Sequence, residues 1–286
     1  MKKKSISYFV FTIFLLFSTS LFSQVSQEKR VIKILAIGNS FSSDAVENYM
    51  YDLAMEGGDS LVIGNVYFGG CSLQRHLGNA TNNLKVYDYR KIVGGEKTIY
   101  PKKSLSDCIL DENWDYITFQ QASGYSGIYS SFSSLTDLLV YVKNLAMNPN
   151  VQFALHQTWA YVENSKHPDF SNYNNNQLVM FYAIADTYCQ VATDFNISIV
   201  IPVGTAIQNG RSSCIGDNFC RDGYHLNLKT GCYIAACTWV EKLTGKSVVN
   251  NPFVPKTISD FDSKILQHAA HYAVLQPYSI TEMADF

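Results

Sequence analysis

The stretch that decides the fold runs from Val31 to Ile37, with the sequence VIKILAI, and leads directly into Gly38-Asn39-Ser40. Every residue of the run except Lys33 is apolar. A short and nearly continuous apolar run is typical of a strand that lies buried in a parallel sheet. In open sheets of this kind, ligands bind at the carboxyl ends of the strands. The sequence therefore predicts a first strand over 31–37 and a functional turn around Ser40.

Four further short apolar runs have the character of buried strands, and helical patterns alternate with them. The expected strands are Leu61–Phe68, Asp115–Phe119, Val151–Leu155 and Ile197–Ile201, and the expected helices are Asp44–Met55, Ser134–Met147, Gln177–Phe195 and Leu228–Leu243. Strands that alternate with helices predict a parallel sheet covered on both faces. We therefore expect an α/β fold of the flavodoxin-like kind, with three α/β/α layers around a central parallel sheet of about five strands.

Three segments fall outside this alternation. Residues 85–101 carry strand-type sequence on both sides of Gly94-Gly95, which favours a hairpin insertion. Residues 257–275 favour a C-terminal helical extension, and the polar stretch Asn164–Asn176 is typical of a long surface loop. No internal repeat or low-complexity linker divides residues 24–286, so a single domain is the simplest interpretation.

The N-terminus has the pattern of an export signal. A basic start, an apolar run from about Tyr8 to Phe17 and a small-residue zone predict a signal peptide over residues 1–23. The apolar run is shorter than the roughly 20 residues that a membrane-spanning helix needs, and an uncleaved anchor is the alternative. We expect an exported protein, periplasmic or extracellular, with no stable membrane insertion after cleavage.

Export permits disulfides, and Cys214 and Cys220 are the best candidate pair among seven cysteines.

Composition argues against several classes of partner. The net charge of −2 creates no field that would recruit nucleic acid or an anionic membrane. No C-x-x-C pair occurs, and the histidines show no credible metal spacing, so we expect neither a metal nor an organic cofactor. The sequence leaves the oligomeric state open.

Polar motifs follow the predicted strands at the points where each strand ends. They are Gly69-Gly70, Gln120-Gln121, the stretch from His156 to Trp159 and, before the last core helix, Asp222-Gly223-Tyr224-His225. A serine hydroxyl is a poor nucleophile unless a base lies within hydrogen-bond reach, and histidine suits that task. A carboxylate must in turn hold the imidazole and stabilise its charged form. The three-residue spacing of Asp222 and His225 allows one tight turn to present both groups.

The order of these motifs resembles that of the SGNH/GDSL hydrolases, and more narrowly an uncharacterised secreted branch of that superfamily, similar to carbohydrate esterases. The Gly-Asp/Asn-Ser turn of the family matches Gly38-Asn39-Ser40, its second-block glycine matches Gly70, and its Asp-x-x-His motif matches Asp222 to His225. The resemblance implies that Ser40 is the nucleophile, His225 the general base and Asp222 the carboxylate. The backbone N–H groups of Ser40 and Gly70 would then form the oxyanion hole.

One motif departs from the family pattern. The third block of the family is Gly-x-Asn-Asp, whose asparagine donates to the oxyanion, whereas this chain has Gln120-Gln121-Ala122-Ser123. A glutamine amide can donate in the same way, so Gln120 or Gln121 is expected to complete the hole. If neither side chain reaches, only backbone donors remain, and loss of one donor typically costs about 10²–10³ in rate. His156 and Trp159 are candidate substrate contacts, with packing as the alternative for both.

The resemblance implies a serine esterase that hydrolyses acyl esters through an acyl-enzyme. Its expected substrate is an acylated small molecule or glycan, with O-acetyl groups on carbohydrates favoured. The alternatives are a lipase or thioesterase and a non-catalytic glycan-binding protein on a hydrolase scaffold. A pocket with long apolar walls would favour lipids, and a shallow groove edged by aromatic side chains would favour glycans.

Overall fold

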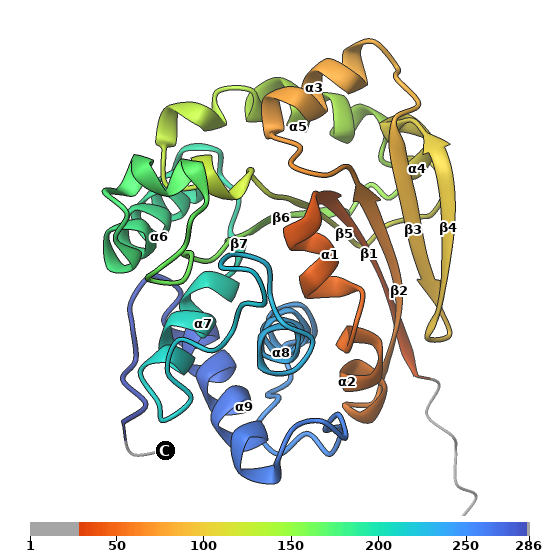
Figure 1. The fold of residues 1–286 in the computed structure, drawn as a ribbon. Helices are drawn as coiled ribbons and strands as arrows, with labels where there is room; N and C mark the ends of the chain where they lie inside the picture. The colour runs from red at the N-terminus through yellow and green to blue at the C-terminus, as the bar shows by residue number, and fades with distance from the viewer. Residues whose placement is uncertain (1–28, 285–286) are drawn as a thin grey trace, which may run out of the picture.

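The computed structural model describes residues 29–284, which form one seven-stranded sheet in the order β4-β3-β2-β1-β5-β6-β7 (Figure 1). The expected signal peptide, residues 1–23, lies outside the described residues. The strands are β1 (Arg30–Gly38), β2 (Asp59–Tyr67), β3 (Tyr87–Val93), β4 (Glu96–Lys103), β5 (Tyr116–Phe119), β6 (Gln152–His156) and β7 (Ile199–Ile201).

Five of the strands form the parallel part of the sheet, and the α/β fold class is confirmed. Strand β1 pairs in parallel with β2 on one side and with β5 on the other, and β6 and β7 continue the sheet beyond β5. From β1 the chain first adds β2, β3 and β4 on one side of β1, and then returns to add β5, β6 and β7 on the other side. The strand order therefore reverses between β1 and β5, which is a topological switch point. Ligands of open α/β sheets bind at such a point, beside the carboxyl ends of the strands.

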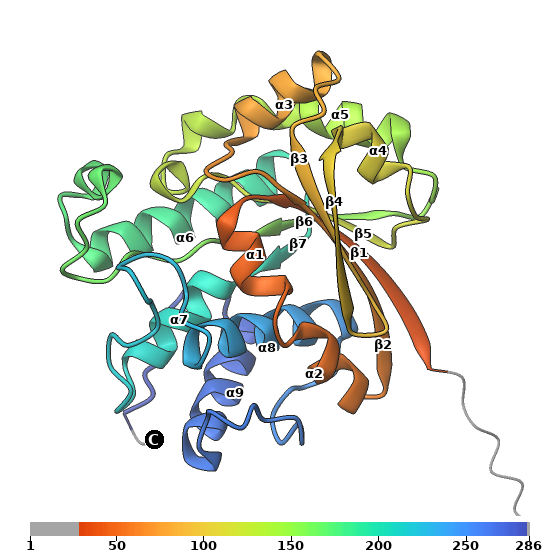
Figure 2. The same cartoon turned by 45° about the vertical axis from the view of Figure 1, so that its right-hand side comes forward.

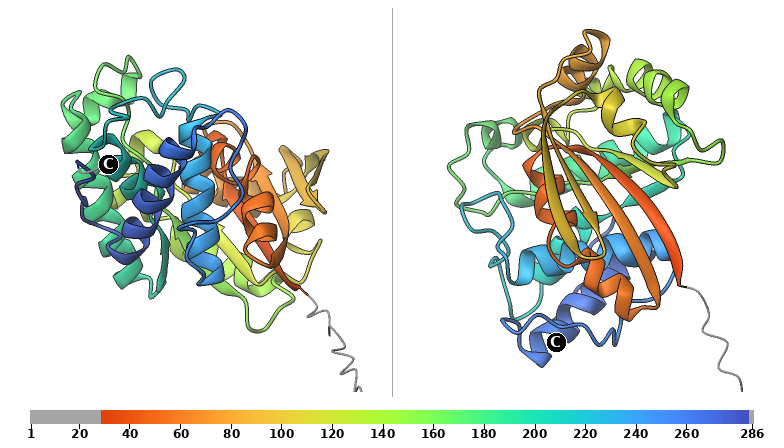
Figure 3. Two further views of the ribbon diagram at one scale, coloured as in Figure 1. Left: turned by 90° about the horizontal axis from the view of Figure 1, so that it is seen from below. Right: turned by 90° about the vertical axis from the view of Figure 1, so that its right-hand side faces the viewer.

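The segment expected as a hairpin insertion forms β3 and β4, which join the main sheet at the edge of β2 (Figure 3, right). Both pairings are antiparallel, so the sheet is mixed and has seven strands instead of about five. Arg90 of β3 fixes the hairpin to the body of the fold. Its Nη1 lies 3.3 Å from the almost fully buried carboxylate of Glu47, and its guanidinium lies over the ring of Tyr67 at 3.6 Å.

Helices cover both faces of the sheet (Figures 1 and 2). One face carries α3, α4 and α5, and the other carries α1, α2 and α8, with α7 and α9 packed against α8. Helix α6 contacts α7 and the edge strand β7. The bounds are α1 (Ser40–Val46), α2 (Met50–Glu56), α3 (Leu73–Thr81), α4 (Leu105–Ile109), α5 (Leu135–Leu145), α6 (Gln177–Asp194), α7 (Val203–Arg211), α8 (Thr230–Thr244) and α9 (Asp260–Leu275).

The prediction of one helix over Asp44–Met55 is wrong, because two short helices occupy this region. Helix α1 begins earlier, at Ser40, and ends at Val46, and α2 begins only at Met50. The side-chain amide of Asn48 donates to the backbone oxygen of Asp44 over 3.1 Å. This bond satisfies a carbonyl at the end of α1 that would otherwise need a continuing helix.

The aromatic residues that are so frequent in the sequence serve mainly to fill the interior. All three tryptophans are buried in the core, together with many tyrosine and phenylalanine rings. Within residues 29–284, no helix has both the length and the apolar character that a transmembrane segment requires.

Candidate active site

Ser40 lies where β1 ends and α1 begins, at the switch point of the sheet. Asn39 caps the helix, because its Oδ1 accepts the backbone N–H of Phe41 over 3.0 Å. Such a cap satisfies one of the first N–H groups of a helix, which lack partners within the helix itself. The Gly-Asn-Ser turn therefore holds Ser40 as the first residue of α1.

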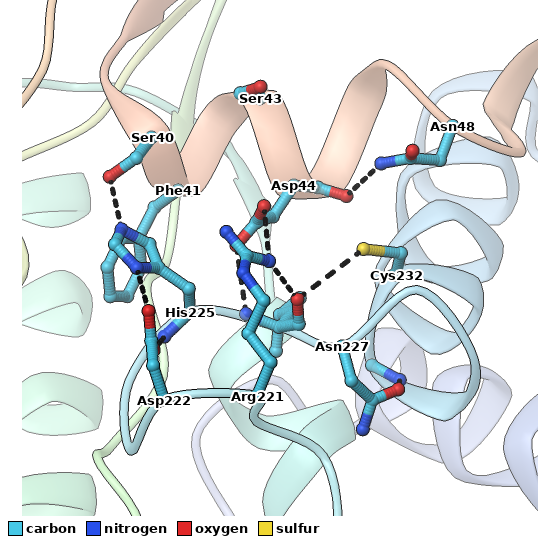
Figure 4. Close-up of polar contacts among 12 residues, drawn as sticks. Ser40, Phe41, Ser43, Asp44, Asn48, Arg221, Asp222, His225, Asn227 and Cys232 are labelled. Atoms are coloured by element: carbon cyan, nitrogen blue, oxygen red, sulfur yellow. Dashed lines mark hydrogen bonds and ion pairs between the residues drawn. The ribbon is translucent and has the colours of Figure 1, made fainter.

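The structure brings Ser40, His225 and Asp222 together in one hydrogen-bonded row (Figure 4). His225 Nε2 lies 2.8 Å from Ser40 Oγ, and His225 Nδ1 lies 2.7 Å from Asp222 Oδ2. The second oxygen of Asp222 accepts the backbone N–H of His225 over 2.8 Å. A carboxylate at Nδ1 favours the tautomer with the proton on Nδ1, which leaves Nε2 free to accept the proton of Ser40.

The environment of Asp222 keeps this carboxyl group ionised. Partial burial raises its pKa, but the hydrogen bonds from the ring and backbone of His225, together with the charge of that ring, outweigh burial and hold the pKa below its usual value. An ionised Asp222 can orient the imidazole and stabilise it after it takes up a proton.

A second carboxylate, Asp44, ties the loop that carries this pair to α1. Asp44 lies one helical turn after Ser40, and its Oδ2 accepts the backbone N–H of Leu226 over 2.8 Å. Its Oδ1 lies 3.0 Å from Arg221 Nη1, and the same nitrogen donates to the backbone oxygen of Leu226 (Figure 4). Burial raises the pKa of the Asp44 carboxyl, and the nearby Arg221 offsets this effect only in part. Asp44 and Arg221 therefore act as positioning residues for His225.

The loop that carries Gly70, an expected oxyanion donor, has open space at the position of a side chain. Gly70 has φ +61°, and no atom lies within 4 Å of the place where a Cβ would stand. Gly70 and Ser40 line the same pocket. The Nδ2 of Asn39 donates to the backbone oxygen of Cys71 over 3.1 Å, so the Ser40 turn and the Gly70 loop are joined directly.

The glutamines expected to complete the oxyanion hole have other partners. Gln120 is buried, and its Nε2 donates to Asn39 Oδ1 over 2.7 Å. Gln121 is also buried; its Nε2 donates to the backbone oxygen of Ser131 over 2.8 Å, and its Oε1 accepts the N–H groups of Leu73 and Ala122. Both amides therefore support the loops around the site, and the interpretation of either as an oxyanion donor is corrected.

His156 was a candidate for substrate contact, but its side chain is fully buried below the site. Its Nδ1 lies 3.1 Å from Gln120 Oε1, so His156, Gln120 and Asn39 form a hydrogen-bonded chain that ends at the Ser40 turn. Because Oε1 can only accept, His156 donates from Nδ1. Burial lowers the pKa of His156 to about 3, so the ring stays neutral.

Trp159 is likewise buried and cannot stack on a substrate. Its indole ring stacks on Phe41 with centroids 4.2 Å apart, and its Nε1 donates to the backbone oxygen of Tyr224 over 2.7 Å. Trp159 therefore supports both the start of α1 and the loop that carries His225. The position of Trp159 after β6 correctly placed it at the carboxyl ends of the strands. It could not show that the ring points into the core.

A pocket of about 490 Å³ opens beside Ser40 and His225. This volume falls within the usual range for small-molecule sites, roughly 300–1,000 Å³. Aromatic side chains and short polar segments line it, among them Phe41, Tyr67, Tyr125, Tyr224, Ser123, His167 and Asp169. The mixture of rings and polar groups is closer to a groove edged by aromatics than to a long apolar channel.

The cysteines and metal-ligating groups add no further chemistry to this site. Cys214 and Cys220, the expected disulfide pair, are free thiols in the structure. Burial raises the pKa of the Cys71 thiol, next to Gly70, to about 12, so it stays protonated. Across the part of the chain that the structure describes, no group of three or more His, Cys, Asp or Glu side chains could hold a metal ion.

Sequence reasoning missed the roles of Asp44 and Arg221. Arg221 directly precedes Asp222, and Asp44 follows Ser40 by four residues, the spacing that places two side chains on one face of a helix. These spacings are visible in the sequence, but the contact between the two residues spans 177 positions and depends on the fold.

We expect Asp44→Asn to lower kcat on an aryl acetate by roughly 10–100-fold with little change in KM, because displaced catalytic groups lose that much rate. The substitution removes the ion pair with Arg221 but keeps the shape of the side chain. Glu56→Gln, at an exposed carboxylate of α2, is the matched control. Equal kcat values for the two variants, each with an intact thermal transition, would contradict the positioning role.

The buried histidines predict a loss of stability in acid. The pKa values of His76 and His156 are lowered by burial to about 4 and about 3. Since histidine in the unfolded chain titrates near ~6.5, the unfolded state binds more protons below that pH, and stability falls as the pH is lowered. The free energy of unfolding should therefore drop as the pH falls from about 6.5 towards about 4 and about 3, the pKa values of the two folded-state histidines, and it should drop less for His156→Gln. Identical pH dependence in both proteins would contradict this role of His156.

Comparison with solved structures gives one strong match and several weak ones. A crystal structure of a DUF4886 family protein from Bacteroides uniformis is 47% identical, with 88% of this chain and 98% of that chain covered and a TM-score of 0.87. A mutant of Axe2, an acetyl-xylooligosaccharide esterase from Geobacillus, is 12% identical over 75% of this chain and 95% of that one, with a TM-score of 0.49. The native aryl esterase of M. smegmatis is 13% identical over 75% and 99%, with a TM-score of 0.47. Likeness at the level of these two esterases bears on neither the activity nor the substrate of this chain.

Among curated proteins, none matches this chain. A family model described as "Domain of unknown function (DUF4886)" matches residues 33–273, which is most of the chain. The chain therefore belongs to the DUF4886 family.

Proposed function

We propose that this protein is a serine esterase of the SGNH/GDSL kind, which hydrolyses O-acyl esters through an acyl-enzyme on Ser40. The observation that carries the proposal is the hydrogen-bonded row of Ser40, His225 and Asp222 at the switch point of the sheet. The order of the motifs along the chain, which resembles that superfamily, supports the same reading.

The geometry suits nucleophilic catalysis in two steps. His225 Nε2 takes the proton of Ser40 while Oγ attacks the ester carbonyl, and Asp222 stabilises the imidazolium that forms. The backbone N–H groups of Ser40 and Gly70 face the oxyanion. His225 then gives the proton to the leaving alkoxide, which departs as an alcohol. A water molecule, activated by the same ring, hydrolyses the acyl-enzyme and restores Ser40.

The substrate that we propose is an O-acetylated carbohydrate. The pocket beside Ser40 is edged by Tyr67, Tyr125 and Tyr224 and carries polar groups between them. Aromatic rings with polar neighbours suit sugars, whose rings have apolar faces and hydroxyl edges. A lipase or thioesterase would instead need a long apolar wall for its acyl chain.

The site of action that we propose is outside the cytoplasm. The pattern of residues 1–23 supports export, with the periplasm and the extracellular space both open.

One observation supports the alternative of a glycan-binding protein without catalysis. The side-chain amides of Gln120 and Gln121, at the third motif, bind other partners and not the pocket. Activity measurements on the wild type separate the two readings.

Acetate release from an aryl acetate and from acetylated saccharides tests the proposal. We expect activity in the wild type and a loss of at least about 10³-fold in Ser40→Ala, since the nucleophile of such a triad carries most of the catalysis. Ser43→Ala, at a neighbouring serine on the same helix that accepts a hydrogen bond from Arg90, is the matched control and should keep its activity. Folded wild type without activity on any ester would contradict the proposal and favour a binding protein.

A further inference from the structure

The pocket beside Ser40 has a second polar wall, which comes from the segment between β6 and α6. This segment includes the 3-10 helix η3 (Pro168–Tyr173), and it places His167 and Asp169 in the lining of the same pocket as Ser40 and His225. The mechanism above uses neither side chain. A ligand whose ester bond lies at Ser40 can therefore extend to this wall.

The segment is held firmly against the short helix η1 (Ser123–Tyr125). Asn172 Nδ2 and Tyr173 Oη both donate to the backbone oxygen of Gly124, over 3.1 and 3.0 Å. Gly124 itself lies so close to Asp169 that a Cβ there would stand 2.2 Å from Asp169 Oδ2. Only glycine at position 124 allows the two segments to lie this close. Close packing against Gly124 therefore fixes the position of Asp169.

The orientation of His167 is fixed as well. Its Nδ1 accepts the backbone N–H of Asp169 over 3.2 Å, so the neutral ring carries its proton on Nε2 and can donate from there. The ring packs against Tyr224, with centroids 4.7 Å apart, and against Tyr161, with centroids 4.8 Å apart. This wall therefore offers a hydrogen-bond donor beside a carboxylate acceptor.

The charge of this wall selects against anions. The side chain of Asp169 is 35% exposed, and Nδ1 of His167, 3.9 Å from its Oδ2, carries no proton because it accepts the backbone N–H of Asp169. Among the described residues that line the pocket there is no lysine or arginine. A negative ligand would meet the carboxylate without a compensating cation, whereas hydroxyl groups could donate to it.

We propose that His167 and Asp169 form a leaving-group subsite that binds the hydroxyl groups of a neutral saccharide whose acetyl ester lies at Ser40. The subsite rests on the esterase function proposed above and narrows its substrate class. Asp169 accepts hydrogen bonds from hydroxyls next to the ester, and His167 donates one. The ring of Tyr224 covers an apolar face of the sugar. The subsite disfavours acetylated saccharides that carry carboxylates.

The test compares three substrates of the same enzyme: an aryl acetate, partly acetylated xylooligosaccharides and acetylated oligogalacturonides of matched length. We expect the wild type to prefer the neutral over the anionic oligosaccharide. In Asp169→Asn, the ratio of kcat/KM on the neutral oligosaccharide to that on the aryl acetate should fall by roughly 10-fold or more, mainly through KM, because hydrogen bonds to a charged group are lost. The preference for neutral over anionic saccharide should shrink at the same time.

Two further variants provide a control and a measurement of binding without turnover. Asp186→Asn, at an exposed carboxylate of α6 outside the pocket lining, should leave all three activities as in the wild type. In the Ser40→Ala background, which blocks turnover, adding Asp169→Asn should weaken binding of the acetylated xylooligosaccharide in calorimetry by a similar factor.

The outcomes separate this inference from the proposed function. Aryl acetate activity that needs Ser40, together with unchanged selectivity and unchanged binding in Asp169→Asn, would overturn the subsite and leave the esterase standing. An equal loss on all three substrates would show that Asp169 acts through packing alone, which also overturns the subsite. Aryl acetate activity that persists in Ser40→Ala would instead overturn the proposed function.

Discussion

The carboxylate of Asp44 connects the two halves of the candidate active site. It lies on the helix that begins at Ser40, and it binds both Arg221 and the backbone of Leu226 in the loop that carries Asp222 and His225. The serine and the histidine are 185 positions apart, and besides this tie they are linked by their own hydrogen bond and by Trp159, which stacks on Phe41 and donates to the backbone oxygen of Tyr224. The tie through Asp44 therefore helps to hold the row of three residues in place.

A chain of neutral hydrogen bonds supports the other side of the site. It runs from His156 through Gln120 to Asn39, and Asn39 joins the Ser40 turn to the loop that contains Gly70. Every member is buried, so each unpaired group would cost free energy, and the network specifies one arrangement of amides. In this family member Gln120, which follows β5, holds the turn that carries Ser40. The proposed oxyanion hole consequently depends on backbone donors, whose positions the same network fixes.

The sequence predicted the parts of this protein that depend on local patterns. The five parallel strands followed from short apolar runs, and the common edge of the sheet brought Ser40 and the Asp222–His225 turn into one neighbourhood. The break between α1 and α2 was missed because it depends on the side chain of Asn48 binding one carbonyl. The direction of the Gln120 and Gln121 amides, the burial of His156 and Trp159, and the partner of Asp44 depend on contacts between distant segments. Such contacts leave no periodicity in the sequence, so the residues could be placed near the site but not given their roles.

The most direct test of the central claim is covalent labelling of the wild-type protein with a fluorophosphonate, followed by mass spectrometry of the intact chain and of its peptides. The reagent reacts with serine hydroxyls that a neighbouring base activates, and it needs no knowledge of the natural substrate. The account predicts one adduct per chain, located on Ser40, and its loss in His225→Ala. No adduct on the folded protein, or an adduct on another serine such as Ser42 or Ser123, would contradict it.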